Sequence, residues 1–127
     1  MEAKFYYVGI RVKDIDESVK FYSKLLGMKE TERHTIEATK GTVAGLKSSD
    51  GKLDLELNHY DRGSPYYVKY AAGEGLDHLA FGVADLDAVL RRAKKLGYTA
   101  IHEVKTEKSR WAYVEDPNGI WIELFQG

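Results

Sequence analysis

Apolar and polar residues along the first part of the chain alternate as in a strand and then recur at helical spacing. The first predicted strand divides its residues between two faces, with Val8, Ile10 and Val12 on one and Tyr7, Gly9 and Arg11 on the other. An amphipathic helix is predicted next, opened by Asp14 or Asp16 and ended near Gly27. Three shorter strands should follow, at roughly residues 29–37, 42–47 and 52–59.

The same pattern occurs a second time along the chain. A shift of 71 residues aligns residues 7–25 with residues 78–96, and five of the 19 positions are identical. The ends of the two stretches also agree, because LDLEL and IWIEL each follow a turn signal, Asp50-Gly51 and Asn118-Gly119. Agreement in order, spacing and turn residues favours two copies of one structural unit.

The second copy predicts its own strand, helix and three strands. Its helix starts near Asp85 or Asp87 and stops at Gly97, and its later strands lie at roughly residues 98–103, 110–115 and 119–125. Residues 61–75 join the copies, and their three tyrosines favour an ordered loop. We therefore expect an α+β protein in which residues 1–127 form one domain of two βαβββ modules, at about 4–60 and 76–126, with a helix covering one face of each sheet.

Composition narrows the class of protein further. The 127 residues contain 19 Lys and Arg against 20 Asp and Glu, for a net charge of −1, and no cysteine. Nucleic-acid binding needs a basic face, which this balance disfavours, and the absence of cysteine excludes disulfides, thiolate metal sites and a cysteine nucleophile. The N-terminal stretch MEAKFYYVGIRVKD has no apolar run long enough for a signal or membrane segment. We expect a cytoplasmic protein that acts on a small molecule and has no nucleic-acid or membrane partner.

Four polar positions point to chemistry on the sheet face opposite the helices. Glu56 and Glu123 occupy equivalent places in the two copies, and so do Tyr7 and His78. Glu123 lies between Trp121 and Phe125 on its own face, which is an unusual setting for a merely solvated carboxylate. Two equivalent pairs would converge if the sheets curve around one cavity. Oxygen and nitrogen donors without sulfur suit Ni²⁺, Co²⁺, Mn²⁺, Fe²⁺ or Zn²⁺.

Three stretches resemble a known superfamily: GIRVKDIDESVKFYSKLLGM, GLDHLAFGV and EDPNGIWIEL. They are similar to the vicinal oxygen chelate superfamily, and within it to glyoxalase I (lactoylglutathione lyase) over nearly the whole chain. The resemblance implies paired βαβββ modules that form a cupped, mostly antiparallel sheet around a divalent metal ion. It places Glu56, His78 and Glu123 at three metal-ligand positions. The fourth ligand in the family is His or Gln, whereas this chain has Tyr7.

The resemblance also implies an activity. A 2-oxoaldehyde–thiol hemithioacetal would chelate the metal ion (Ni, Co, Zn, Mn or Fe) and react through an enediolate, with Glu123 carrying the proton between the two carbons. Tyr7 and Arg11 would bind substrate, Arg11 holding an anionic part of a thiol such as glutathione. Small members of the superfamily pair into homodimers, which we expect here too. Two alternatives stay open: a metal-free small-molecule binding protein of the antibiotic-sequestering type, and an epimerase that acts next to a thioester.

Overall fold

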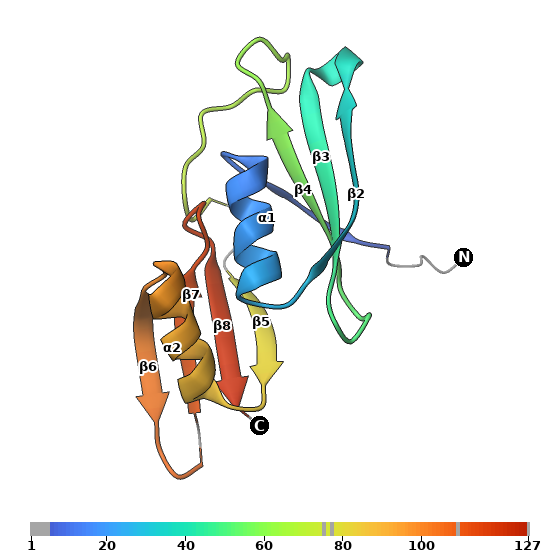
Figure 1. The fold of residues 1–127 in the computed structure, drawn as a ribbon. Coiled ribbons are helices and arrows are strands. Elements are labelled where there is room, and N and C mark those ends of the chain that lie inside the picture. The colour runs from blue at the N-terminus through green and yellow to red at the C-terminus, as the bar shows by residue number, and fades with distance from the viewer. Residues whose placement is uncertain (1–5, 75, 77, 109, 127) are drawn as a thin grey trace, which may run out of the picture. The chain divides into compact units, whose positions relative to one another are not determined.

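The computed structural model describes residues 6–74, 76, 78–108 and 110–126 (Figure 1). The chain divides between residues 70 and 71 into two compact units. Each unit contains one α-helix and a four-stranded sheet, which is the α+β architecture expected from the repeat.

In the first unit, the first and last strands along the chain are neighbours in the sheet. Its elements are β1 (Val8–Arg11), α1 (Ile15–Lys24), β2 (Lys29–Ile36), the short 3₁₀ turn η1 (Glu37–Thr39), β3 (Gly41–Lys47) and β4 (Asp54–Tyr60). The sheet order is β1-β4-β3-β2, in which β1 runs parallel to β4 and the other neighbours are antiparallel. The parallel pair therefore brings the first and last strands of the module together.

The second unit repeats this order of strands and helix. Its elements are β5 (His78–Val83), α2 (Leu86–Leu96), β6 (Ala100–Lys105), β7 (Arg110–Glu115) and β8 (Trp121–Gln126). The order is β5-β8-β7-β6, again with a parallel pair, β5 and β8, joining the ends of the module. The predicted elements are confirmed, with boundaries that differ by up to two residues at several strand ends.

Both helices begin at the first of the two aspartates that the sequence offered. The Asp14 carboxylate accepts a hydrogen bond from the Glu17 backbone N–H at 2.9 Å, and the Asp85 carboxylate accepts one from the Ala88 N–H at 3.1 Å. These side chains satisfy backbone donors that have no partner within the helix. Gly97 ends α2 with φ of 92°, a conformation that glycine adopts without steric cost. Within the described residues, no helix is long and apolar enough to cross a membrane.

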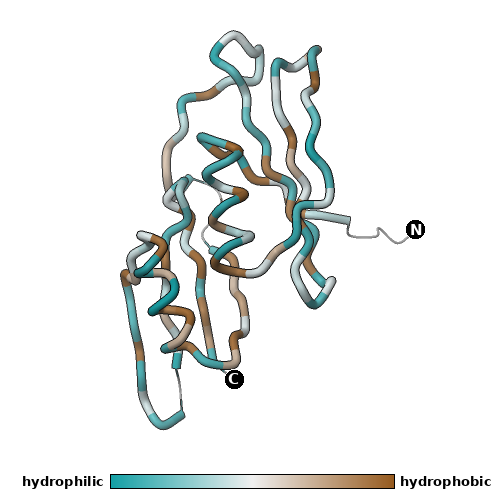
Figure 2. The backbone as a smooth tube through the Cα atoms, in the orientation of Figure 1, coloured by the Kyte–Doolittle hydropathy of each residue, from teal (hydrophilic) through white to brown (hydrophobic). Residues whose placement is uncertain are grey.

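Each helix covers one face of its own sheet, and the core of each unit lies between its helix and its sheet. α1 packs against β2, β3 and β4, and α2 packs against β6, β7 and β8. Figure 2 shows apolar and polar positions interspersed along both helices and along the strands behind them. The fully buried large residues on the apolar sides include Phe21, Tyr22, Leu57, Ile122 and Leu124. The alternation read from the sequence is confirmed, because the opposite faces of the end strands carry polar or exposed side chains.

The strand registers place the two glutamates at matching positions. Glu56 on β4 lies beside Gly9 on β1, and Glu123 on β8 lies beside Ala80 on β5. Gly9 and Ala80 each lie two residues after the equivalent positions Tyr7 and His78. The internal repeat therefore extends to residue-by-residue pairing within each sheet.

Candidate active site

In the first unit, Glu56 lies on the sheet face that points away from α1. It is half-buried and lies between Gly9 of β1 and Gly45 of β3, neither of which has a side chain to cover it. A Cβ atom on Gly9 would lie 3.4 Å from Nδ2 of Asn58 and 3.9 Å from Cε2 of Tyr7. Tyr7 and Asn58 therefore approach each other over the same part of the sheet. Glu56 is reachable from this face, with Tyr7 and Asn58 beside it.

In the second unit, Glu123 and His78 both contact one tyrosine. Tyr113 of β7 lies opposite Glu123 in the antiparallel ladder and donates a hydrogen bond from its hydroxyl to Oε1 of Glu123 at 3.2 Å. The ring centroid of His78 lies 5.6 Å from that of Tyr113, with the rings nearly perpendicular. A carboxylate, an imidazole and a phenol therefore share the face away from α2. The hydrogen bond restricts Glu123, and its second oxygen remains an available acceptor.

Aromatic rings extend from this group across the same face. The ring of Trp121 lies 5.4 Å from Tyr113 and 5.3 Å from His102, and Trp111 lies 5.6 Å from Tyr113. Trp121 is 38% exposed and Phe125 is 42% exposed. Aromatic surface that reaches solvent on a polar sheet face can contact a ligand. We call His102, Trp111, Tyr113 and Trp121 the aromatic cluster.

Arg11, at the end of β1, is held in place by its own unit. One guanidinium nitrogen donates to the backbone carbonyl of Tyr66 at 2.8 Å, and the guanidinium carbon lies 4.7 Å from the centre of the Tyr60 ring. A cation over an aromatic face is attracted by the ring's electron density. Because a guanidinium carries five N–H donors, this arrangement leaves donors for an anionic ligand.

Two equivalent turns fix the strands that carry the glutamates. In the second unit the buried Asp116 carboxylate accepts hydrogen bonds from the backbone N–H groups of Asn118 at 2.7 Å and Ile120 at 2.9 Å. It also accepts one from the Asn118 side chain at 3.0 Å. In the first unit, the exposed Asp50 accepts from the Ser48 hydroxyl at 2.7 Å and from the backbone N–H of Lys52 at 3.0 Å. These bonds hold the pKa of the Asp50 carboxyl below its usual value, and the bond from Ser48 has the largest effect.

The sequence-predicted residues therefore divide between the units. His78 and Glu123 share a face in the second unit, while Glu56, Tyr7 and Arg11 lie in the first. No group of three or more His, Cys, Asp or Glu side chains forms a metal site within the part of the chain that the structure describes. Convergence of Glu56, His78 and Glu123 on one ion stays a prediction. Their chemistry fits a divalent cation, since two carboxylates and an imidazole are accessible on polar sheet faces.

Sequence reasoning missed Tyr113 and Asp116. Tyr113 could have been found from strand alternation, which places it on the opposite face from Ala112 and Val114 and so on the face of Glu123. The hydrogen bond that Tyr113 makes could not have been found in this way, because it depends on which residue of β8 lies opposite Tyr113. Asp116 belongs to a motif used for the resemblance, but its role in bonding the turn becomes clear only from the three distances.

Comparisons with known proteins agree with this fold. Residues 4–124 match the family model described as the Glyoxalase/Bleomycin resistance protein/Dioxygenase superfamily. The chain is 33% identical to the uncharacterized protein YwbC of Bacillus subtilis, over 99% of both chains. It is 34% identical to a lactoylglutathione lyase of Haemophilus influenzae, over 92% of this chain and 87% of that one. The solved structure of the trypanothione-dependent glyoxalase I of Leishmania major superposes with a TM-score of 0.78 at 30% identity, over 98% of this chain and 87% of that one.

Proposed function

Because the chain belongs to the glyoxalase/bleomycin resistance protein/dioxygenase superfamily, we propose that it is a lyase of the glyoxalase I type. Its substrate would be the hemithioacetal that forms between a 2-oxoaldehyde and a thiol. The single observation that supports this proposal most strongly is the matching placement of Glu56 and Glu123, each beside the first strand of its module and on the face away from the helix.

The proposed site needs the two units to present these faces to one cavity, within one chain or between two chains of a homodimer. Glu56, His78 and Glu123 would then hold a divalent metal ion, and Tyr7 would lie at the position of a fourth ligand. The ion, when bound, would supply Lewis-acid stabilisation of negative charge on the two adjacent substrate oxygens. Tyr7 also has a hydroxyl that can donate a hydrogen bond to a substrate oxygen.

The reaction itself is a proton transfer between neighbouring carbons. Glu123 removes the proton from the carbon that bears the hydroxyl and the sulfur, and the electron pair left behind forms the enediol double bond. The same carboxyl group then returns the proton to the former ketone carbon, while the proton of the original hydroxyl passes to the former ketone oxygen. The carbon that bears the sulfur becomes the carbonyl of a 2-hydroxy thioester. No atom is gained or lost, so the chemistry needs no oxidant. Tyr113 would hold one oxygen of Glu123, while the other would dissociate from the ion in order to move the proton.

Arg11 would contribute binding rather than chemistry. Its position two residues beyond Gly9 on the same strand face places it about 6.6 Å further along β1 than the level of Glu56. A carboxylate on the thiol part of the substrate could pair with its free N–H donors.

The test measures metal content and isomerisation together. The protein is stripped of metal, loaded with Ni²⁺, Co²⁺ or Zn²⁺, and assayed with methylglyoxal and several thiols, including glutathione. We expect thioester formation, with kcat reduced at least about 100-fold by Glu123→Gln because a proton-transfer group is lost. Glu56→Gln should lower metal affinity, whereas Glu107→Gln, at an exposed position, should change neither. Absence of activity with every thiol and metal would refute the lyase.

The aromatic cluster favours a second candidate function, a metal-free binding protein for a flat small molecule. Trp121 and Phe125 expose aromatic surface beside Glu123, and stacking on such rings holds planar ligands. Elemental analysis separates the two candidates. Stoichiometric metal that is lost in Glu56→Gln supports the lyase, while tryptophan fluorescence that responds to a planar ligand in metal-free protein, with no turnover, supports the binding protein.

A further inference from the structure

The second unit has a groove between its helix and the outer edge of its sheet, which we call the α2–β6 groove. It has a volume of about 630 Å³ and is lined by residues of α2, of β6 and of the turn between them. Leu90, Tyr98 and Ala100, all partly buried, contribute apolar surface to it. Because α2 covers the sheet face opposite to that of Glu123, a ligand in this groove leaves the face of Glu123 open.

β6 offers backbone hydrogen-bonding groups along this groove. It is the last strand in the sheet order β5-β8-β7-β6, and it pairs with β7. In an antiparallel pair, alternate residues direct their N–H and C=O groups away from the partner strand, so an edge strand presents a row of groups that an extended peptide can bind. β6 spans Ala100–Lys105, which gives about 20 Å of edge at about 3.3 Å per residue.

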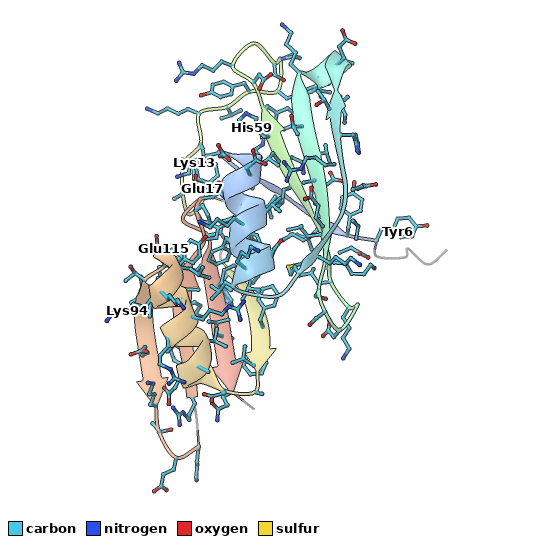
Figure 3. All side chains as sticks on the ribbon, viewed as in Figure 1. Tyr6, Lys13, Glu17, His59, Lys94 and Glu115 are labelled. Carbon is cyan, nitrogen blue, oxygen red and sulfur yellow. The ribbon has the colours of Figure 1, made fainter. Side chains whose placement is uncertain are left out.

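The charged residues that line the groove leave two cations without a carboxylate partner. Nζ of Lys105 lies 2.7 Å from the Asp87 carboxylate and 4.0 Å from that of Glu103, so both acidic residues of the groove are next to Lys105. Among the residues that the structure describes, no ion pair involves Arg91 or Lys94. Both side chains are exposed on α2, and Figure 3 shows Lys94 near β6 on the outer side of this unit. The groove therefore presents free positive charge beside the strand edge.

The internal repeat shows that the fold does not require this positive charge. Residues 91–95 of α2 contain four Arg and Lys, whereas the matching residues 20–24 of α1 contain two. The shift of 71 residues matches the exposed Arg92 with Phe21, which is fully buried in the first unit. Basic residues in the last turn stabilise a helix through its dipole, yet α1 has one such residue where α2 has two. The additional cations on α2 are therefore free to serve an interaction.

We propose that the α2–β6 groove binds an extended acidic peptide segment of a partner protein, which pairs with β6 as an additional strand. Successive side chains of a strand point to opposite faces, so every second side chain of the peptide faces α2. Those side chains are Asp or Glu, and they pair with Arg91 and Lys94. A second copy of this chain is a poor partner, because pairing of β6 with β6 brings the same cations together. This inference does not depend on the proposed lyase function.

The experiment measures the fluorescence anisotropy of a fluorescein-labelled peptide of about eight residues, in which Glu alternates with Thr or Val, as the protein is added. We expect saturable binding, which becomes about tenfold weaker when every Glu is replaced by Gln, because two partly exposed ion pairs are lost. Arg91→Ala/Lys94→Ala should weaken binding of the Glu peptide by a similar factor. Lys20→Ala/Lys24→Ala removes two exposed positive charges from α1 and should leave the affinity unchanged. Thermal melts show whether both double variants are folded.

Methylation of the peptide's amide nitrogens tests the strand pairing itself. In a bound strand, one alternate set of N–H groups faces β6 and the other set faces away from it. Methylation of one set should therefore abolish binding, whereas methylation of the other set should have little effect. A contact that depends on charge without strand pairing would respond equally to both sets.

The proposal is overturned by the absence of saturable binding, by equal affinity for the Gln peptide, by equal weakening in the α1 control, or by equal response to the two methylated sets. Tighter binding of octauridylate than of the peptide would assign the groove to nucleic acid. Self-association of the protein that is lost in Arg91→Ala/Lys94→Ala would assign it to a second copy. Either of these two results would also overturn the proposal.

Discussion

The turn between β7 and β8 tests how a buried carboxylate holds β8, the strand that carries Glu123, in place. Asp116 is 4% exposed and bonds to two backbone N–H groups and one side-chain amide. Asp116→Ala removes both acceptor oxygens with these three hydrogen bonds, and it leaves the N–H groups of Asn118 and Ile120, both buried residues, without this partner. Each buried donor that loses its partner costs about 1–3 kcal/mol.

The expected loss in the free energy of unfolding follows from these contacts. Two such donors give a range of about 2–6 kcal/mol, and because water can reach part of a turn we expect about 3 kcal/mol. For 127 residues, an unfolding entropy of about 2.1 cal/mol/K per residue converts this loss into a fall in Tm of about 11 °C. Asp116→Asn keeps one oxygen as an acceptor and should lose about half as much.

The equivalent turn of the first unit supplies the control. Asp50 accepts hydrogen bonds from one backbone N–H and one hydroxyl and is exposed, so water replaces the lost acceptor in Asp50→Ala and the fall in Tm should be clearly smaller. Urea denaturation and thermal melts followed by far-UV circular dichroism measure both variants. The reasoning fails if Asp116→Ala loses less than about 1 kcal/mol or no more than Asp50→Ala.

Two further predictions concern charge and backbone conformation. Hydrogen bonds from Lys105 and from the arginine that begins β7 lower the pKa of the Asp87 carboxyl. The stability that this carboxylate contributes is therefore present above its unfolded pKa of about 4 and is lost as pH falls through the lower folded pKa. Urea midpoints measured from pH 6 to pH 2 should therefore fall less steeply at the acid end in Asp87→Asn than in the parent, and parallel curves would contradict this. Gly119 has φ of 79°, and a Cβ there would lie 2.7 Å from the Cβ of Ala72, so Gly119→Ala should cost more than about 2 kcal/mol. Gly51 has a similar φ, but a Cβ atom there would meet open space, so Gly51→Ala should cost only about 1 kcal/mol of stability. Equal melting temperatures for the Gly119 and Gly51 variants would show that the close contact with Ala72 has no effect.

The element order and the faces of the strands could be derived from the sequence because they depend on local periodicity. Ile10 and Val12 are buried while Gly9 and Arg11 are exposed, as period-two alternation requires. The repeat added the equivalence of Glu56 and Glu123, and the strand registers confirm it within each unit. Local patterns also limited each helix start to two aspartates.

Tertiary structure decided what depends on residues distant in the chain. It selected Asp14 and Asp85 as the helix caps, whereas Asp16 and Asp87 bond to basic residues of neighbouring strands. It brought the first and last strands of each module together in parallel, a pairing that joins segments more than 40 residues apart.

The candidate site shows the same division. Residue types and equivalence selected Glu123 from the sequence, but its hydrogen bond to Tyr113 exists because β7 and β8 pair in one particular register. Arg11 was expected to bind an anion, yet its contacts with Tyr60 and Tyr66 arise from a segment about 50 residues later that folds back over the end of β1. Periodicity depends on residues that are close in the sequence and can be derived from the sequence alone. Strand register and loop placement, in contrast, result from the packing of the whole unit.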